Sequence, residues 1–229
     1  LAVRGKEIYF AKGVELYKEG KFKESAESFE QSLGPAAVNR VIYANLGSAY
    51  ASAGEMQKAE NNFLGALADN PGNPQVLLNA AHFFETTKQF AQAVTYYKKS
   101  LSLNPQDLDL RRSLAYCYFN LGEYGKALEL YEALGRENDV VSSLNAALCC
   151  VAMGDLNKAE VLIEALMEAS APLPKLYLVR AEIYRKKKLF PEAELEYKKF
   201  LQLQKGDLGA LTGLGFLYLE MNDNAQAED

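Results

Sequence analysis

The sequence has little of what catalytic and metal sites require. Its 229 residues include no tryptophan, three cysteines and one histidine, His82. A single histidine without clustered cysteines or paired carboxylates predicts neither a zinc site nor a recognisable catalytic triad. The glycines recur at long regular intervals, which does not indicate a phosphate-binding loop. We therefore expect no catalytic residue, no metal site and no cofactor, and we do not expect an enzyme.

Charge and hydropathy argue against two further classes of protein. The 25 basic and 30 acidic residues give a formal net charge of −5, whereas nucleic-acid binders are usually basic. No uninterrupted apolar run is long enough to cross a bilayer. We expect neither nucleic-acid binding nor membrane insertion.

The cysteines predict reduced thiols. Cys117, Cys149 and Cys150 are odd in number and two are adjacent, so they form no disulfide framework. A cytoplasmic location is favoured on this ground. It stays open, because the chain begins at Leu1 without an initiator methionine and a targeting signal could already have been removed.

A period of 34 residues organises the chain. Small residues recur at Gly13, Gly47, Ala81, Ala115, Ala147, Ala181 and Gly215, and again at Ser25, Ala59, Ala93, Ala127, Ala159, Ala193 and Ala227. Large residues recur at Phe29, Phe63, Tyr97, Tyr131, Ile163 and Tyr197. Each step is 34 residues, except for one step of 32 in each series, which in the first series lies between Ala115 and Ala147. Small residues allow two helices to approach closely while a ring fills the space beside them, so the pattern predicts stacked helices.

Each period predicts a helical hairpin. Residues 41–52 have helical spacing, Gly54 interrupts them, and residues 56–68 resume a second amphipathic run. The turn position repeats as Gly20, Gly54, Gly122 and Gly154, and as Lys88, Lys188 and Asn222 in the other repeats. A left-handed residue commonly ends a helix at such a place, so Lys or Asn there should cost a little stability or change the turn slightly.

The stretches NLGSAYASAGEMQKAENNFLGALADNP and SLAYCYFNLGEYGKALELYEAL resemble tetratricopeptide repeats. The resemblance covers nearly the whole chain and implies an all-α fold, an α-solenoid in which hairpins form a right-handed superhelix. Five positions depart from the family pattern. Arg111 and Ser143 replace large apolar residues, and Leu134, Leu166 and Phe200 replace small ones.

The repeats predict one domain over residues 1–229. Its repeats span residues 6–39, 40–73, 74–107, 108–139, 140–173 and 174–207, with a partial repeat at 208–229. Because the partial repeat lacks its second helix, we expect the natural protein to continue past Asp229. Gly209, Gly213 and Gly215 should weaken the last helix and allow it to fray.

The resemblance also implies a concave groove lined by the first helix of each repeat. Its candidate peptide-binding residues are Asn45, Asn79, His82, Arg112, Tyr116, Phe119, Asn145, Leu148, Lys175 and Arg185. Asn45, Asn79 and Asn145 share one position and could contact the backbone of an extended peptide, although asparagine is common there in this family whatever the ligand. Tyr116, Phe119, Leu144 and Leu148 could form an apolar pocket or belong partly to the core.

Two charged features can each be interpreted in more than one way. Arg112, Asn145 and Lys175 match part of the carboxylate clamp of chaperone-binding family members, but Tyr116 and Val179 replace two of its residues. The basic run at 185–188, with Lys175 and Arg180, is either a solvated turn or a rim that attracts an acidic partner segment.

The predicted function is a scaffold or adaptor that binds a peptide segment or helix of a partner protein. The alternative is a regulatory or substrate-docking arm of a larger multidomain protein such as an enzyme. Self-association through the terminal repeats would show as a mass that rises with protein concentration.

Overall fold

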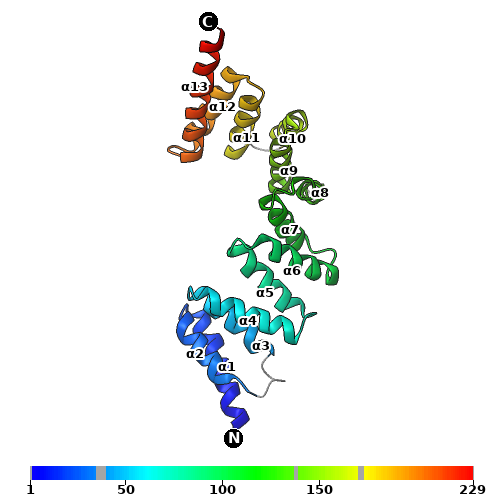
Figure 1. Ribbon diagram of the computed structural model, residues 1–229, viewed down its shortest axis with the longest axis vertical. Coiled ribbons are helices and arrows are strands. Elements are labelled where there is room, and N and C mark those ends of the chain that lie inside the picture. Colours follow the sequence, from blue (N-terminus) through cyan, green and yellow to red (C-terminus); the bar gives the residue numbers. More distant parts are fainter. Residues whose placement is uncertain (1, 35–39, 137–138, 170–172, 229) are drawn as a thin grey trace. The chain divides into compact units, whose positions relative to one another are not determined.

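The computed structural model describes residues 2–34, 40–136, 139–169 and 173–228, with side chains described for residues 5–34, 41–136, 139–169 and 173–222. Within these ranges all regular structure is α-helical (Figure 1). The helices are α1 (Ala2–Lys18), α2 (Phe22–Ser32), α3 (Arg40–Ser52), α4 (Met56–Asp69), α5 (Pro74–Thr86), α6 (Phe90–Leu103), α7 (Leu108–Asn120), α8 (Tyr124–Gly135), α9 (Val140–Met153), α10 (Leu156–Ala169), α11 (Pro174–Lys186), α12 (Phe190–Leu203) and α13 (Leu208–Glu228).

Consecutive helices pack as hairpins, which confirms the predicted all-α solenoid. The packed pairs include α1 with α2, α3 with α4, α5 with α6, α9 with α10, and α11 with α12. The chain forms two compact parts, an N-terminal module of residues 1–117 and a C-terminal module of residues 118–229. The predicted single domain and its repeat boundaries stay predictions.

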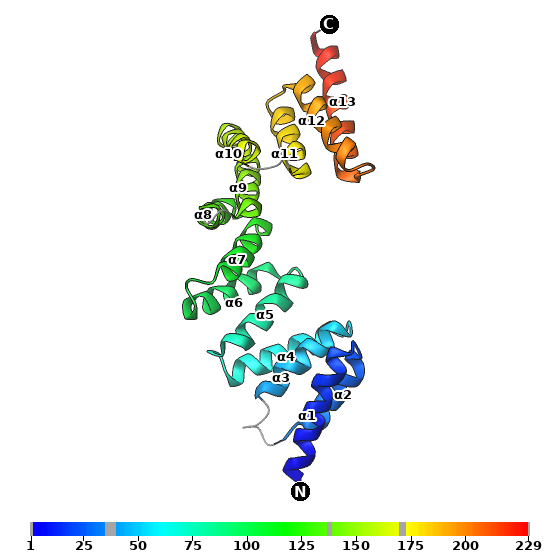
Figure 2. The same ribbon diagram turned by 180° about the vertical axis from the view of Figure 1, so that it is seen from behind.

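First helices lie beside one another within each module. In the N-terminal module α3 contacts α5, and in the C-terminal module α11 contacts both α9 and α13. Both views of the ribbon show α9 between α8 and α10 (Figures 1 and 2), and α9 packs against each of them. First helices therefore lie side by side at α3 and α5 in the N-terminal module and at α9, α11 and α13 in the C-terminal module.

The core consists of the residues that carry the period. Ala59, Ala93, Ala127, Ala159 and Ala193 are all fully buried. The large residues that follow in the second helices are at most 2% exposed: Phe29, Phe63, Tyr97, Tyr131, Ile163 and Tyr197. Ser25 takes the place of alanine in the first repeat, and its hydroxyl donates to the Gly13 carbonyl over 2.7 Å. This polar residue is therefore buried without an unsatisfied group.

In the first two hairpins, a close helix approach joins a glycine to a ring sixteen residues later. A Cβ atom on Gly47 would lie 2.9 Å from the Phe63 ring, and one on Gly13 would lie 2.7 Å from the Phe29 ring. Both distances are shorter than carbon atoms tolerate. In the C-terminal module, a Cβ atom on Gly213 would lie 2.7 Å from the Tyr197 hydroxyl, so this glycine of α13 allows the ring to approach.

Polar caps fix where several first helices begin, a feature that the repeat pattern did not predict. The Asn73 side chain accepts bonds from the backbone N–H groups of Gln75 and Val76, at 2.9 and 3.1 Å. Asp139 caps α9 in the same way at Val141 and Ser142. Such caps satisfy N–H groups that a helix start leaves unpaired.

The departures from the family pattern are accommodated differently. Leu134 and Phe200 are 1% and 4% exposed, so the core takes these larger residues. Leu166 and Arg111 are half-buried. Ser143 is half-buried beside Gly135 and lines an open cleft.

The predicted turn at Asn222 is wrong. Helix α13 runs without interruption from Leu208 to Glu228, so Asn222 lies inside it. Residues 222–229 contain no large apolar residue, so within this stretch no apolar face draws the chain out of α13. Ala227, expected in a buried position, has no described side chain.

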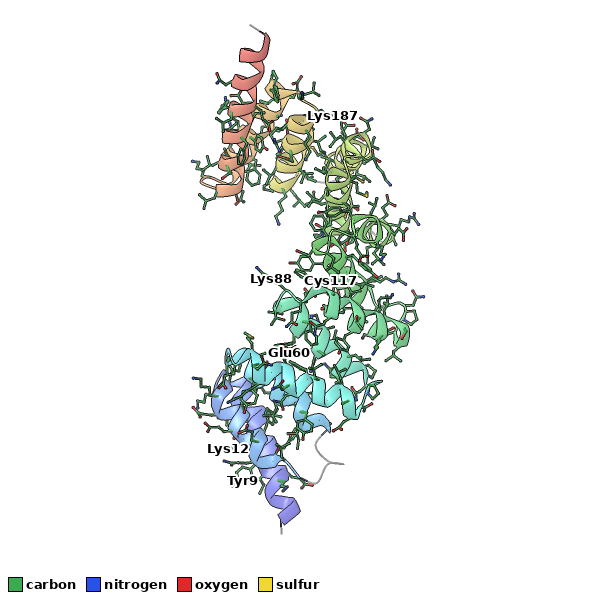
Figure 3. All side chains as sticks on the ribbon, viewed as in Figure 1. Tyr9, Lys12, Glu60, Lys88, Cys117 and Lys187 are labelled. Carbon is green, nitrogen blue, oxygen red and sulfur yellow. The ribbon has the colours of Figure 1, made fainter. Side chains whose placement is uncertain are left out.

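The turn glycines have the predicted left-handed backbone. Gly20, Gly54, Gly122 and Gly154 have φ between +76° and +83°. Lys88 and Lys188 occupy the same position with φ of +61° and +60°. Figure 3 shows the Lys88 side chain pointing away from its hairpin. A left-handed lysine is strained because its Cβ atom approaches the following carbonyl.

Replacing Lys88 with glycine should therefore stabilise the protein, by about 0.5–1 kcal/mol, because the gain at the left-handed turn exceeds glycine's entropic cost. Thermal unfolding followed by circular dichroism measures this as a higher Tm. The matched control is Lys98→Gly at an exposed position inside α6, which should destabilise by about 1 kcal/mol. A lower Tm for both variants would contradict the role of the left-handed turn.

Gly47→Ala should destabilise the protein by about 1–3 kcal/mol, because the added methyl group overlaps the Phe63 ring. Gly65→Ala is the control, since Gly65 lies inside α4 with no atom within 4 Å of its missing Cβ. That change should stabilise by up to about 1 kcal/mol. Equal effects in denaturant unfolding would show that the close approach does not govern packing.

Candidate functional site

The predicted groove positions of the N-terminal module lie on the unburied face of its first helices. Asn45 on α3 and Asn79 on α5 are half-buried, and His82 on α5 is exposed. Their helix neighbours Leu46 and Leu77 are 2% and 1% exposed. One face of each helix is thus packed, while the face that carries the predicted residues is open.

The two asparagine amides bond along their own helices. Asn45 Nδ2 donates to the Val41 carbonyl over 2.9 Å. Asn79 Oδ1 accepts a bond of 2.7 Å from Gln75 Nε2. These bonds orient both amides without using their full hydrogen-bonding capacity. That these asparagines contact the backbone of a bound peptide stays a prediction.

His82 belongs to a polar cluster that sequence reasoning missed. The buried Tyr97 hydroxyl donates to Glu85 Oε2 over 2.5 Å and lies 2.8 Å from His82 Nδ1. Because the hydroxyl has one hydrogen, His82 Nδ1 carries its own and donates it to Tyr97. Burial, together with the Glu85 carboxylate, raises the pKa of the Tyr97 hydroxyl. The cluster therefore fixes the histidine ring on the exposed face of α5.

Arg112 and Tyr116 lie on α7 in the N-terminal module. Arg112 is half-buried and forms an ion pair with Asp109 on the same helix. Tyr116 is 45% exposed, and its ring meets Phe90 edge-on at 6.0 Å between centroids. Tyr116 is therefore an accessible aromatic residue supported by a neighbouring ring.

The C-terminal module holds the remaining predicted residues. Phe119 is half-buried against Tyr124, with ring centroids 5.3 Å apart. Asn145 and Leu148 are half-buried on α9, and Lys175 is exposed at the start of α11. Leu144, the fourth residue of the predicted apolar pocket, is only 6% exposed and belongs to the core.

Arg185 is occupied by two carboxylates. Its guanidinium donates to both Glu182 oxygens, at 3.1 and 2.6 Å, and to Glu220 on α13. Glu182 also accepts the Tyr197 hydroxyl over 2.9 Å. Burial opposes ionisation of Glu182, but the bonds from Arg185 and Tyr197 outweigh it and lower the pKa of this carboxyl.

These clusters occupy equivalent positions of the period. His82 and Glu182 lie one hundred residues apart at the same place in the repeat, as do Glu85 and Arg185 and the two tyrosines. The signal that could have found them is a tyrosine where other repeats have phenylalanine, because a buried hydroxyl needs a partner.

The basic run of the sixth repeat is partly neutralised. Arg180 donates twice to the buried Glu196, at 3.0 and 2.8 Å, and Lys187 pairs with Glu160. With Arg185 also paired, the exposed cations that remain from the predicted rim are Lys175, Lys186 and Lys188. The local positive charge is therefore smaller than the sequence suggests.

The three thiols are fully buried. Burial raises the pKa of Cys117 and of Cys149 to about 12 and raises that of Cys150, which makes them poor nucleophiles at neutral pH. In the described ranges no three potential metal-ligating residues lie together. No helix of the described chain has the length and apolar character that a bilayer span requires.

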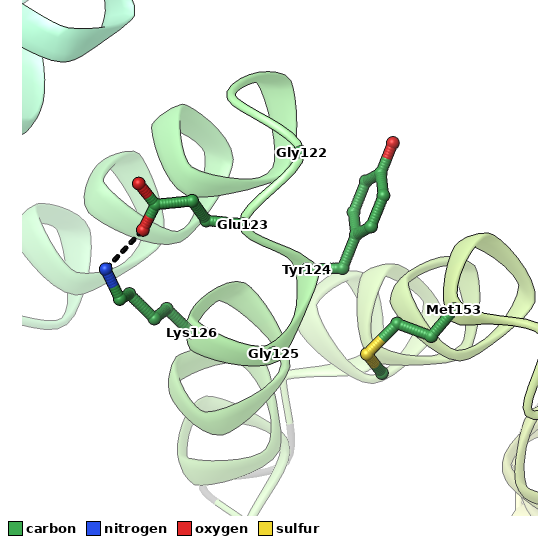
Figure 4. A pocket seen from close by; sticks show the side chains of 6 residues that line it. All are labelled: Gly122, Glu123, Tyr124, Gly125, Lys126 and Met153. Carbon is green, nitrogen blue, oxygen red and sulfur yellow. Dashed lines mark hydrogen bonds and ion pairs between the residues drawn. The ribbon is translucent and has the colours of Figure 1, made fainter.

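A shallow hollow of about 480 Å³ lies at the α7–α8 turn of the C-terminal module. Figure 4 shows the side chains of Tyr124 and of Met153, at the end of α9, on one side of the turn, while Glu123 and Lys126 pair with each other on the other side. Gly122 and Gly125 also line the hollow, and as glycines they place no side chain in it.

Two family models match the chain. Residues 86–166 match the model of subunit 3 of the anaphase-promoting complex, or cyclosome. Residues 10–74 match a model described as tetratricopeptide repeat. The chain is a tetratricopeptide-repeat protein. Proteins of this family generally mediate protein–protein interactions and are usually not catalytic.

Curated relatives include proteins of differing roles. The repeat chain is 26% identical over 95 residues to the general transcriptional corepressor trfA of Dictyostelium discoideum, covering 42% of this chain and 7% of the corepressor. It is 26% identical over 158 residues to the Vi polysaccharide export protein VexE of Salmonella typhi, covering 66% of this chain and 24% of VexE. The chain thus spans less than a quarter of either relative.

Solved structures share the fold. A MamA structure has a TM-score of 0.63 and 24% identity, covering 71% of this repeat chain and 95% of MamA. PilF of Pseudomonas aeruginosa has a TM-score of 0.63 and 16% identity, covering 99% of this chain and 98% of PilF. At these identities the likeness establishes the solenoid of tetratricopeptide repeats alone.

The Glu182–Arg185 pair predicts a pH-dependent stability. Arg185→Gln should destabilise the protein by about 1–2 kcal/mol at pH 7, because it removes charged hydrogen bonds from a half-buried carboxylate. A carboxyl whose folded pKa is lowered contributes stability above its unfolded pKa of about 4.3 and loses it as pH falls through the folded pKa. The difference between variant and wild type should therefore shrink by pH 3.

Thermal unfolding at pH 7 and pH 3 tests this dependence. Arg136→Gln is the control, because Arg136 is exposed and has no ion pair in the described chain. It should show no pH-dependent difference from wild type. An equal loss for Arg185→Gln at both pH values would assign Arg185 a packing role instead.

Proposed function

We propose that this tetratricopeptide-repeat chain is a scaffold that binds an extended segment or a helix of a partner protein on its row of first helices. The observation that carries the proposal is the split between the two faces of these helices. On α5, Leu77, Ala80 and Phe84 are at most 1% exposed, while His82 is exposed. On α9, Ala147 is fully buried, while Asn145 is half-buried.

The open face has the chemistry of a peptide-binding surface. Asn79 and Asn145 can each donate to and accept from a peptide backbone, and Tyr116 adds a rigid, accessible ring of the type that dominates binding energy. Each of these side chains projects from a helix whose other face is packed, so little ordering entropy is lost on binding.

The second candidate is a docking arm of a larger polypeptide. It is favoured by the small share of trfA and VexE that the chain covers, 7% and 24%. In both candidates the first-helix face binds protein, and the full gene sequence distinguishes them by showing whether a catalytic domain is attached.

A bait experiment tests the groove. The chain and a variant carrying Asn79→Ala, Tyr116→Ala and Asn145→Ala are used to capture proteins from a lysate of the source cell. We expect the triple variant to capture about tenfold less of a partner protein, or less still, because central contacts carry most of the binding energy.

The matched control alters exposed residues of second helices, Leu64→Ala, Lys98→Ala and Val161→Ala. It should retain the partner, and circular dichroism must show equal helicity for all three proteins. Loss in the control with retention in the groove variant would assign binding to the second-helix face.

A further inference from the structure

The junction of the fourth and fifth repeats lacks two large side chains. The position of Gly135 is large and apolar in every other complete repeat, as Leu33, Leu67, Leu101, Met167 and Leu201. The position of Ser143 is Tyr43, Leu77, Arg111, Tyr177 and Leu211 elsewhere. Both small residues thus occur together at the one junction where the period shortens to 32 residues.

The two positions face each other in the C-terminal module. A Cβ atom on Gly135 would lie 2.6 Å from Ser143 Oγ, so the end of α8 meets the start of α9 there. The missing side chains leave an open cleft of about 340 Å³, lined by Glu132, Gly135, Arg136, Ser143, Ala146 and Leu162. This volume lies at the small end of the range of about 300–1,000 Å³ that ligand pockets have, and it is large enough for one apolar side chain.

The walls of the cleft are apolar. Ala146 is 1% exposed, and Leu162 on α10 is half-buried. Two charged residues, Glu132 and Arg136, also line the cleft. Glu132 pairs with Lys158 over 2.8 Å, whereas Arg136 is exposed and makes no ion pair in the part of the chain that the structure describes. Of these two lining charges, Arg136 is therefore the one that a ligand carboxylate can pair with.

We propose that this cleft binds a leucine-sized apolar side chain of an acidic partner segment, with Arg136 pairing a carboxylate next to that side chain. The apolar walls favour burial of the side chain, and an arginine fork suits a carboxylate. The cleft lies at the α8–α9 junction and uses no residue of the predicted groove. It is a second attachment point beyond the first-helix face.

Short fluorescent peptides test the cleft directly. The probe has a central leucine flanked by aspartates, and its matched versions replace the leucine by alanine or the aspartates by lysines. Anisotropy titrations against the full chain should show binding of the first peptide and about tenfold weaker binding of both others.

Two variants assign the binding to the cleft. Ser143→Leu fills the cleft with leucine, the residue found at the equivalent position of the third repeat, Leu77. This variant should bind the leucine peptide more weakly, by about tenfold or more. Arg136→Glu, at an exposed position, should lower the affinity for the aspartate peptide and raise the affinity for the lysine peptide. Asn79→Ala with Asn145→Ala should leave the affinity unchanged, which separates this site from the proposed groove.

The proposal is overturned if the leucine–aspartate peptide does not bind at millimolar concentration, or if Ser143→Leu binds it as wild type does with unchanged helicity. Binding that is lost only in the asparagine variant would place the peptide in the groove instead.

Discussion

The whole architecture depends on the close approach of a small residue on each first helix to a large residue sixteen positions later. Where the small residue is glycine, as in Gly13 and Gly47, a ring occupies the volume of a missing Cβ atom. Because this contact recurs at one phase of the period, every hairpin closes in the same way. The direction of the remaining side chains then follows, since a helix packed on one face exposes the other.

The ring position also determines where polar groups can enter. Phenylalanine at Phe29 and Phe63 needs no partner, whereas the hydroxyls of Tyr97 and Tyr197 bring charged residues of the preceding first helix beside them. The two clusters differ in the residues at equivalent positions. The Tyr97 cluster has histidine followed by glutamate, and the Tyr197 cluster has glutamate followed by arginine. One hydroxyl group per repeat therefore changes the electrostatic character of the surface above it.

The fold could be predicted from the sequence because the burial signal repeats in phase. The left-handed turns were found from glycine alone, and Lys88 and Lys188 followed from register. The turn at Asn222 was predicted wrongly, because register was extended into residues 222–229, a stretch with no large apolar residue. A period predicts where a hairpin fits, and packing decides whether it forms.

The candidate site was less predictable for a different reason. The position of a residue in the repeat shows on which helix face its side chain lies. It does not show which neighbouring group its polar atoms bond to. Arg185 was expected at an open rim and instead links α11 to α13 through Glu220. From the sequence, Ser143 was only a departure from the family pattern. The cleft beside it is recognised only once Gly135, eight residues earlier, is seen to lie against it. Such pairs across helices are set by three-dimensional packing.

The Tyr97 cluster gives the exposed face of α5 a direction of hydrogen bonding. Since the tyrosine hydrogen points to Glu85, the Nδ1 hydrogen of His82 is directed at Tyr97, and in this tautomer Nε2 is an acceptor. A partner atom at this place must then be a donor, such as a backbone N–H or a serine hydroxyl.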